Sequence, residues 1–149
     1  MKVRGFGFKN AFRGIAYAVM NERNFRVHIV AMLTVVYFAA VFGIEKWQWA
    51  VIVLAVATLM AAELINTALE KTVDEISPQK SEFARIVKDC AAAAVLVLAI
   101  GAVVLAAVIF SDSDGWQRVW QYITHSYGWL IAFTLLGTGF IYMKKENKR

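Results

Sequence analysis

The chain alternates long apolar runs with short polar segments. The apolar runs cover residues 27–44, 50–62, 91–110 and 127–143. Because a helix rises 1.5 Å per residue, about 20 residues are needed to cross the ~30 Å hydrocarbon core of a bilayer. We therefore expect three core membrane helices and a shorter fourth span near the C-terminus, over residues 127–143.

Two further segments have the pattern of helices that lie on a membrane surface. Before the first run, apolar residues recur at helical spacing, at Phe8, Phe12, Ile15 and Val19. The segment 116–126 repeats the pattern with Trp116, Trp120 and Ile123. Helices of this kind bury one face in the headgroup region. The sequence thus predicts an all-α membrane protein with an N-terminal amphipathic surface helix, three core transmembrane helices and a fourth, C-terminal one.

The composition excludes a soluble globule. Hydrophobic residues make up 60% of the chain and charged residues 18%, whereas soluble domains contain ~45–50% and ~25%. A single cysteine, Cys90, cannot form an internal disulfide. The formal net charge of +5 comes from basic residues at the ends of the apolar runs. This placement is typical of a membrane protein, and we expect no nucleic-acid partner.

The distribution of Lys and Arg predicts the topology. Basic residues concentrate before residue 27, in the polar segment 70–89 and after residue 143, while the alternate loops hold only Lys46 and Arg118. Loops rich in Lys and Arg face the cytoplasm. Both termini and the segment 70–89 are therefore expected to be cytoplasmic, which requires four spans.

The second apolar run is too short to cross a membrane unless its helix continues through Glu63 and Asn66. Glu63, Asn66, Glu70 and Asp74 are spaced i, i+3, i+7 and i+11, which places them on one helix face. A carboxylate inside a bilayer costs roughly 3 kcal/mol, and such groups normally face a protein interior or a wet cleft. This stripe could be polar glue between helices. It could also carry chemistry, and one alternative is a small proton-coupled transporter that uses Glu63.

Other polar residues lie at the ends of the apolar runs. Glu22, the only acid among the first 44 residues, comes just before the first run. Carboxylates from separate segments can hold Mg²⁺. His28 has no Cys or His at zinc spacing, so we expect a packing role at the interface. Lys88 and Asp89, at the start of the third run, offer a cation for phosphate and an acceptor for a sugar or base.

Two motifs resemble those of a known family. Residues 63–74 read E-L-I-N-T-A-L-E-K-T-V-D and residues 88–96 read K-D-C-A-A-A-A-V-L. They resemble the signatures E-x-x-N-[ST]-A-x-E-x-x-V-D and K-D-x-x-x-x-A-V-L of the small bacterial membrane lipid kinases, the diacylglycerol kinase and undecaprenol kinase family. The resemblance covers residues 5–110. It implies a homotrimer in the bacterial inner membrane, with active sites at subunit contacts, that transfers the γ-phosphoryl group of ATP to a lipid hydroxyl with Mg²⁺.

The resemblance also implies roles for individual residues. Glu63 would be the general base on the lipid hydroxyl and Asn66 would help orient this hydroxyl, while Glu22 and Glu70 would hold Mg²⁺. The residues implied around ATP are Asn10, Arg13, Glu22, Glu70, Asp74, Lys88 and Asp89. The segment 22–28 favours undecaprenol over diacylglycerol as the substrate.

Two parts of the chain depart from the family pattern. Residues 79–81 read Q-K-S, where the family often has an acidic and aromatic stretch ending in His, so nucleotide contacts from this loop are in question. Residues 111–149 lie outside the resemblance. We therefore divide the chain into a kinase domain, 1–110, and a second part, 111–149, with an interfacial segment, an extra span and a basic cytoplasmic tail.

Overall fold

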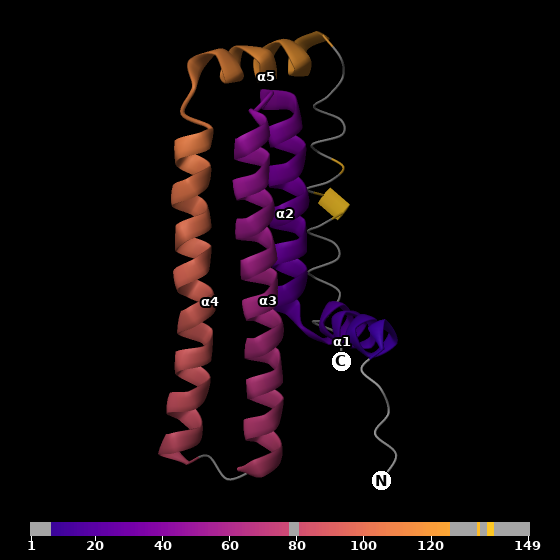
Figure 1. The fold of residues 1–149 in the computed structure, drawn as a ribbon, viewed down its shortest axis with the longest axis vertical. Coiled ribbons are helices and arrows are strands. Elements are labelled where there is room, and N and C mark those ends of the chain that lie inside the picture. The colour runs from indigo at the N-terminus through magenta and orange to yellow at the C-terminus, as the bar shows by residue number, and fades with distance from the viewer. Residues whose placement is uncertain (1–6, 78–80, 126–133, 135–136, 139–149) are drawn as a thin grey trace.

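The protein is described by a computed structural model that covers residues 7–77, 81–125, 134 and 137–138. This part of the chain contains only helices: α1 (Phe8–Asn21), α2 (Arg23–Phe42), α3 (Lys46–Ile76), α4 (Glu82–Ile109) and α5 (Ser113–His125). Helices α2, α3 and α4 run side by side in a long bundle (Figure 1). Helix α5 crosses one end of this bundle, and α1 projects sideways from it toward the other end (Figure 1). The predicted all-α class and the N-terminal amphipathic helix are confirmed.

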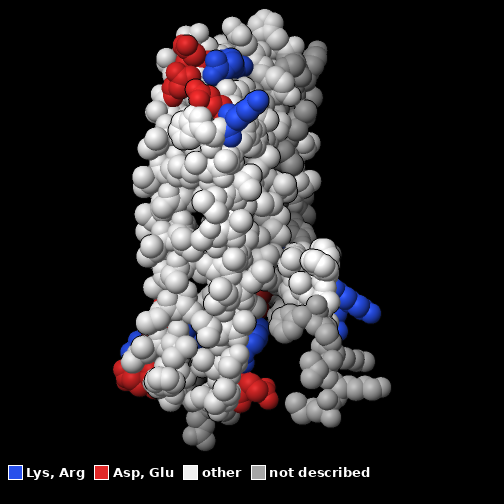
Figure 2. All heavy atoms as spheres, viewed as in Figure 1, with Lys and Arg blue, Asp and Glu red and all other residues white. Residues whose placement is uncertain are grey.

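Of the described helices, three, α2, α3 and α4, are long and apolar enough to cross a membrane. The acidic and basic side chains visible in Figure 2 gather toward the two ends of the molecule, with a belt of other residues between them. Helix α3 has 31 residues, or roughly 46 Å at 1.5 Å per residue, so it is longer than the hydrocarbon core. The three predicted core spans are confirmed. The fourth predicted span, 127–143, lies outside the described residues apart from three isolated positions.

A corner at Glu22 separates the surface helix from the first span. Its backbone is extended (φ −109°, ψ 115°), and its N–H donates to the Ala18 carbonyl at 2.9 Å. Arg26 is buried, and its guanidinium donates to the carbonyls of Val19 and Met20 at 3.2 Å each. These carbonyls belong to the last turn of α1, where cations are favourable. The corner therefore holds Glu22 at a fixed place beside the bundle.

Helix α5 is anchored on the far end of α2. The guanidinium of Arg118 donates to the Phe42 carbonyl at 2.7 Å, just before Gly43 ends α2 in the left-handed conformation at φ 75°. The Phe42 ring packs edge-to-face on Trp116, with ring centroids 5.8 Å apart. Val119 is buried and Trp120 is exposed. The amphipathic helix predicted over 116–126 is thus present and lies across the end of the bundle.

Candidate functional site

The polar stripe predicted along α3 becomes more exposed toward the end of the helix. Glu63 is 3% exposed and Asn66 7% exposed, whereas Glu70 is half-buried and Asp74 is exposed. At 1.5 Å per residue, Asp74 lies roughly 16 Å beyond Glu63 along the helix. The stripe therefore runs from the apolar part of the bundle to its charged end, as its spacing indicated.

Glu63 contacts a side chain of the neighbouring helix α2. His28 Nε2 lies 3.2 Å from Glu63 Oε1, and the His28 side chain is only 19% exposed. Burying a carboxylate is costly unless another polar group compensates it. The His28 ring therefore offsets part of the cost of placing Glu63 inside the bundle.

Asn66 has one satisfied and one unsatisfied polar atom. Its Nδ2 donates to Glu70 Oε1 at 3.0 Å. Its Oδ1 is buried and has no hydrogen-bond partner in the described part of the chain. A buried acceptor left without a donor costs about 1–3 kcal/mol, and such atoms are rare in folded proteins. The Oδ1 atom is therefore a candidate acceptor for a substrate hydroxyl.

The corner residue Glu22 reaches α3 through an ion pair. Glu22 Oε1 lies 3.3 Å from Lys71 Nζ. The carboxylates of Glu22 and Glu70 are both close enough to Glu63 to act on it electrostatically. Carboxylates from two separate segments thus lie along the same stretch of α3, with Glu70 roughly 10 Å beyond Glu63 along the helix and Lys71 as the counter-charge of Glu22.

Two of these carboxylates suit Mg²⁺. This cation prefers oxygen ligands and is often held by one or two carboxylates together with waters and substrate phosphates. Glu22 and Glu70 offer such oxygens. No group of three or more His, Cys, Asp or Glu side chains in the described residues could hold a metal. The protein can therefore supply part of a magnesium shell, and other oxygens must complete it.

Three of the other predicted site residues, Asp74, Lys88 and Asp89, form ion pairs near the turn between α3 and α4. Lys88 forms an ion pair with Asp74 between α4 and α3. Arg85 holds Asp89 at 3.0 Å and also Glu82 at 3.0 Å. These pairs lie at the charged end of the α3–α4 hairpin, beyond the Glu63 level.

The last two predicted residues, Asn10 and Arg13, are exposed on α1. Glu63, Asn66 and Glu70 lie along α3 beside Glu22 of the corner, and Lys88 pairs with Asp74 at the charged end. Asp89 contacts Arg85 of its own helix, and no hydrogen bond or ion pair among the described residues joins Asp89, Asn10 or Arg13 to the other predicted site residues.

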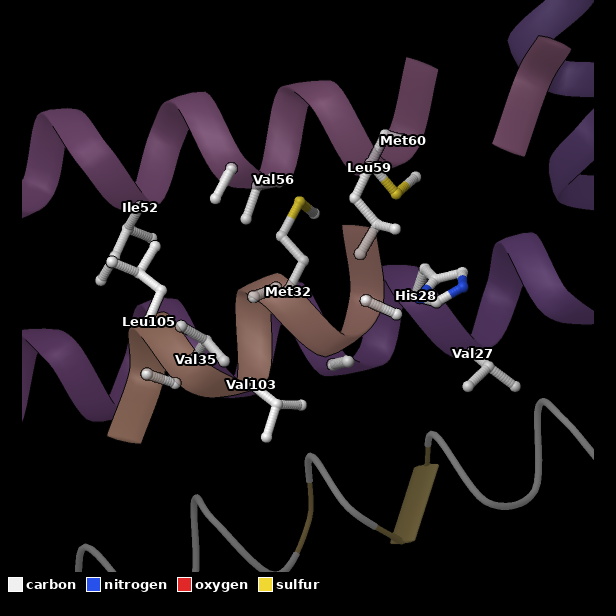
Figure 3. Close-up of a pocket in the computed structure, with 15 residues that line it drawn as sticks. Val27, His28, Met32, Val35, Ile52, Val56, Leu59, Met60, Val103 and Leu105 are labelled. Carbon is white, nitrogen blue, oxygen red and sulfur yellow. The ribbon is translucent and has the colours of Figure 1, made fainter. Parts of the chain in front are cut away.

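An apolar cavity of about 340 Å³ lies between α2, α3 and α4. Ile52 and Val56 of α3 face Met32 and Val35 of α2 across it (Figure 3). His28 lies at the end away from Ile52 and is the only polar side chain in its lining (Figure 3). The cavity thus borders His28, which in turn contacts Glu63.

The contact between His28 and Glu63 was not predicted from the sequence, which indicated a packing role at the interface for His28. The sequence contained a signal for this contact, because a short turn joins α2 and α3, which makes the two helices antiparallel. His28 is 15 residues before Gly43, and Glu63 is 17 residues after Lys46. Residues at similar distances from such a turn lie at similar depth. Counting from the turn would have placed the two residues together.

Comparisons with known proteins match the same part of the chain. A family model described as prokaryotic diacylglycerol kinase matches residues 9–110. A diacylglycerol kinase of Synechocystis sp. is 41% identical over 66% of this chain and 57% of its own length, so the match spans little more than half of that relative. An undecaprenol kinase of Bacillus subtilis is 35% identical over 69% of this chain and 84% of its own length. A diacylglycerol kinase of Escherichia coli is 32% identical over 70% of this chain and 82% of its own length. The chain belongs to the prokaryotic diacylglycerol kinase family.

Proposed function

We propose that the protein is a lipid kinase that transfers the γ-phosphoryl group of ATP to the hydroxyl of a membrane lipid. The observation that carries this proposal is the buried Glu63 of α3, which is followed toward the charged end of the helix by Glu70 and by the Glu22–Lys71 pair. A lipid alcohol and a triphosphate can meet only at a boundary between the apolar and the charged part of the molecule. Membership of the family supports the same reaction.

Glu63 acts as the general base in this proposal. The lipid oxygen forms a bond to the γ-phosphorus, its proton moves to Glu63, and the bond to the bridging oxygen breaks with the electron pair leaving on ADP. Asn66 orients the hydroxyl through its unsatisfied Oδ1. The burial of both residues supports this, because phosphoryl transfer depends on positioning and on the exclusion of water.

The other site residues bind ATP. Glu22 and Glu70 hold Mg²⁺, which neutralises phosphate charge when bound. Lys88 exchanges its ion pair with Asp74 for a phosphate oxygen, and Asp89 contacts the nucleotide. Asn10 and Arg13 of α1 approach both substrates when the surface helix closes over the site. Their exposed positions on α1 leave them accessible to a ligand.

We propose undecaprenol as the lipid, with diacylglycerol as the alternative. The segment 22–28 favours undecaprenol, and relatives of this chain carry both names. A homotrimer in the bacterial inner membrane is part of the proposal, with the active sites shared between subunits. The many large apolar side chains exposed on the bundle provide surface for such contacts. In this scheme both termini are cytoplasmic, residues 1–110 are the kinase domain, and residues 111–149 add an interfacial segment and a fourth span.

The test is a phosphorylation assay on the purified full chain in mixed micelles. Radiolabelled ATP and Mg²⁺ are supplied with either undecaprenol or diacylglycerol, at equal mole fractions. We expect label in the lipid phase, with undecaprenol used faster. Label in neither lipid would overturn the kinase proposal. In that case, a pH gradient that drives proton flux into liposomes containing the protein would favour the transporter alternative.

A further inference from the structure

The contact between His28 and Glu63 joins two helices inside the apolar part of the bundle. His28 Nε2 is 3.2 Å from Glu63 Oε1, at ion-pair distance. His28 lies at the start of α2, and Glu63 lies in the middle of α3. The position of the Glu63 carboxylate therefore depends on how α2 packs against α3.

No other described donor performs this task. The neighbouring cation Lys71 is paired with Glu22 at 3.3 Å. The guanidinium of Arg26 donates to the end of α1. The amide of Asn66, one turn along α3, donates to Glu70. Among the described residues, His28 is thus the only basic side chain at ion-pair distance from Glu63.

The other side of the His28 ring borders apolar side chains. On one side the ring faces Glu63, and on the other it borders the apolar cavity (Figure 3). The side chains that line the cavity, such as Leu59 and Met60, cannot donate a hydrogen bond. Without the imidazole, the Glu63 carboxylate would lose its one described ion-pair partner.

We propose that His28 is a positioning residue for Glu63. Its Nε2–H holds Oε1, so that Oε2 is directed to the lipid hydroxyl and receives its proton. His28 keeps its own proton throughout. The lipid oxygen bonds to the γ-phosphorus, and the electron pair of the broken bond leaves on ADP. This inference rests on the proposed function and adds to it a residue on a second helix that sets the geometry of the base.

Two substitutions in the full chain separate positioning from simple polarity. In His28→Gln, the amide nitrogen can reach the place of Nε2. In His28→Asn, the side chain is one carbon shorter and the nitrogen falls short of Glu63. Loss of a group that orients a metal ligand typically costs 10–100-fold in affinity or activity, and we expect a loss of similar size for a group that orients a base. We expect kcat to fall about 30-fold in the Asn variant and to stay within about threefold of wild type in the Gln variant. The KM for ATP should change by less than about twofold in both.

A nuclear magnetic resonance measurement gives a readout that does not depend on activity. The chain has two histidines, so the ¹⁵N imidazole signals of His28 are identified by their persistence in His125→Gln. We expect Glu63→Gln to shift the Nε2 signal of His28. Comparison with Glu75→Gln, at the exposed end of α3, controls for the loss of a charge.

The outcomes distinguish a failure of the proposed lipid-kinase function from a failure of the positioning role of His28. Label in neither lipid with the wild-type protein would overturn the proposed function, and the positioning role with it. An active wild type with an equally active Asn variant would overturn the positioning role alone. Equal losses in the Gln and Asn variants, at unchanged melting temperatures, would do the same, as would an unshifted His28 signal in Glu63→Gln.

Discussion

Glu22 and Lys71 meet across the corner where the chain turns from the surface helix α1 into the first span, with Nζ 3.3 Å from Oε1. If Glu22 holds Mg²⁺, then Lys71 competes with the metal for the same carboxylate. We predict that Lys71→Gln lowers the Mg²⁺ concentration needed for half-maximal activity about threefold, because an ammonium no longer occupies Glu22. The measurement is a Mg²⁺ titration of the initial rate at saturating ATP and lipid.

The control for this prediction is Lys46→Gln. Lys46 is exposed at the opposite end of α3, so its removal changes the net charge equally but at a distance from Glu22. An unchanged Mg²⁺ requirement in Lys71→Gln would mean that Glu22 is only the structural partner of this lysine. Equal shifts in both variants would point to a general effect of charge on the membrane surface.

Replacing Glu63 by Gln keeps the volume of the side chain but removes its ability to accept a proton. We predict a loss of kcat of about 10³-fold, within the range expected for a general base. Assembly should be unchanged, because Gln keeps the volume of the side chain and a polar oxygen facing His28. The rate of lipid phosphorylation and the elution volume in detergent measure the two effects. Activity within tenfold of wild type would remove the base assignment.

Asn66 should show a conflict between stability and function. Its Oδ1 is buried without a hydrogen-bond partner in the described residues, and replacing such a group with an apolar one of similar size is often neutral or stabilising. We predict that Asn66→Leu loses at least about 100-fold in kcat while its melting temperature stays the same or rises. A clear fall in melting temperature would instead indicate that Asn66 serves mainly as a structural link to Glu70.

The spans and the polar stripe could be predicted because both depend on local periodicity. Apolar runs determine where helices can cross a membrane, and the spacing from Glu63 to Asp74 places these residues on one face whatever surrounds the helix. The continuation of α3 through Glu63 and Asn66 was predicted from length alone, and the structure confirms it.

The contacts between helices could not be derived in the same way. The pairs His28–Glu63 and Glu22–Lys71 join residues 35 and 49 positions apart, and they depend on the rotation of α2 about its axis and on the corner at Glu22. Periodicity gives the face of each helix but not which face its neighbour meets. The buried Arg26, which holds this corner at the end of α1, also has no signature in the sequence beyond its place before an apolar run.

The Lys88–Asp74 pair allows a structural role to be separated from phosphate binding. We predict that Lys88→Met raises the KM for ATP about tenfold, because a cation that can contact phosphate is lost. The exchange of both charges, Asp74→Lys with Lys88→Asp, restores an ion pair between α3 and α4 but not the lysine on α4. If steady-state kinetics show that the exchange variant recovers the wild-type KM, then Lys88 serves only to join the two helices.

The docking of α5 on α2 requires a residue without a side chain at position 115, which is Gly115. A Cβ at this position would lie 2.1 Å from Cζ of the Phe42 ring, so the ring or the helix must move. We predict that Gly115→Ala lowers the stability of the folded protein by about 1–3 kcal/mol through overpacking. The matched control is Gly101→Ala in α4, where a Cβ meets nothing within 4 Å and the higher helix propensity of Ala should stabilise by up to about 1 kcal/mol. Thermal melting in detergent compares the two. Gly115 lies at the end of the bundle opposite the charged end of the α3–α4 hairpin, so kcat measured at low temperature should stay near wild type in both variants. A loss of activity confined to Gly115→Ala would show that the docking of α5 influences the distant site.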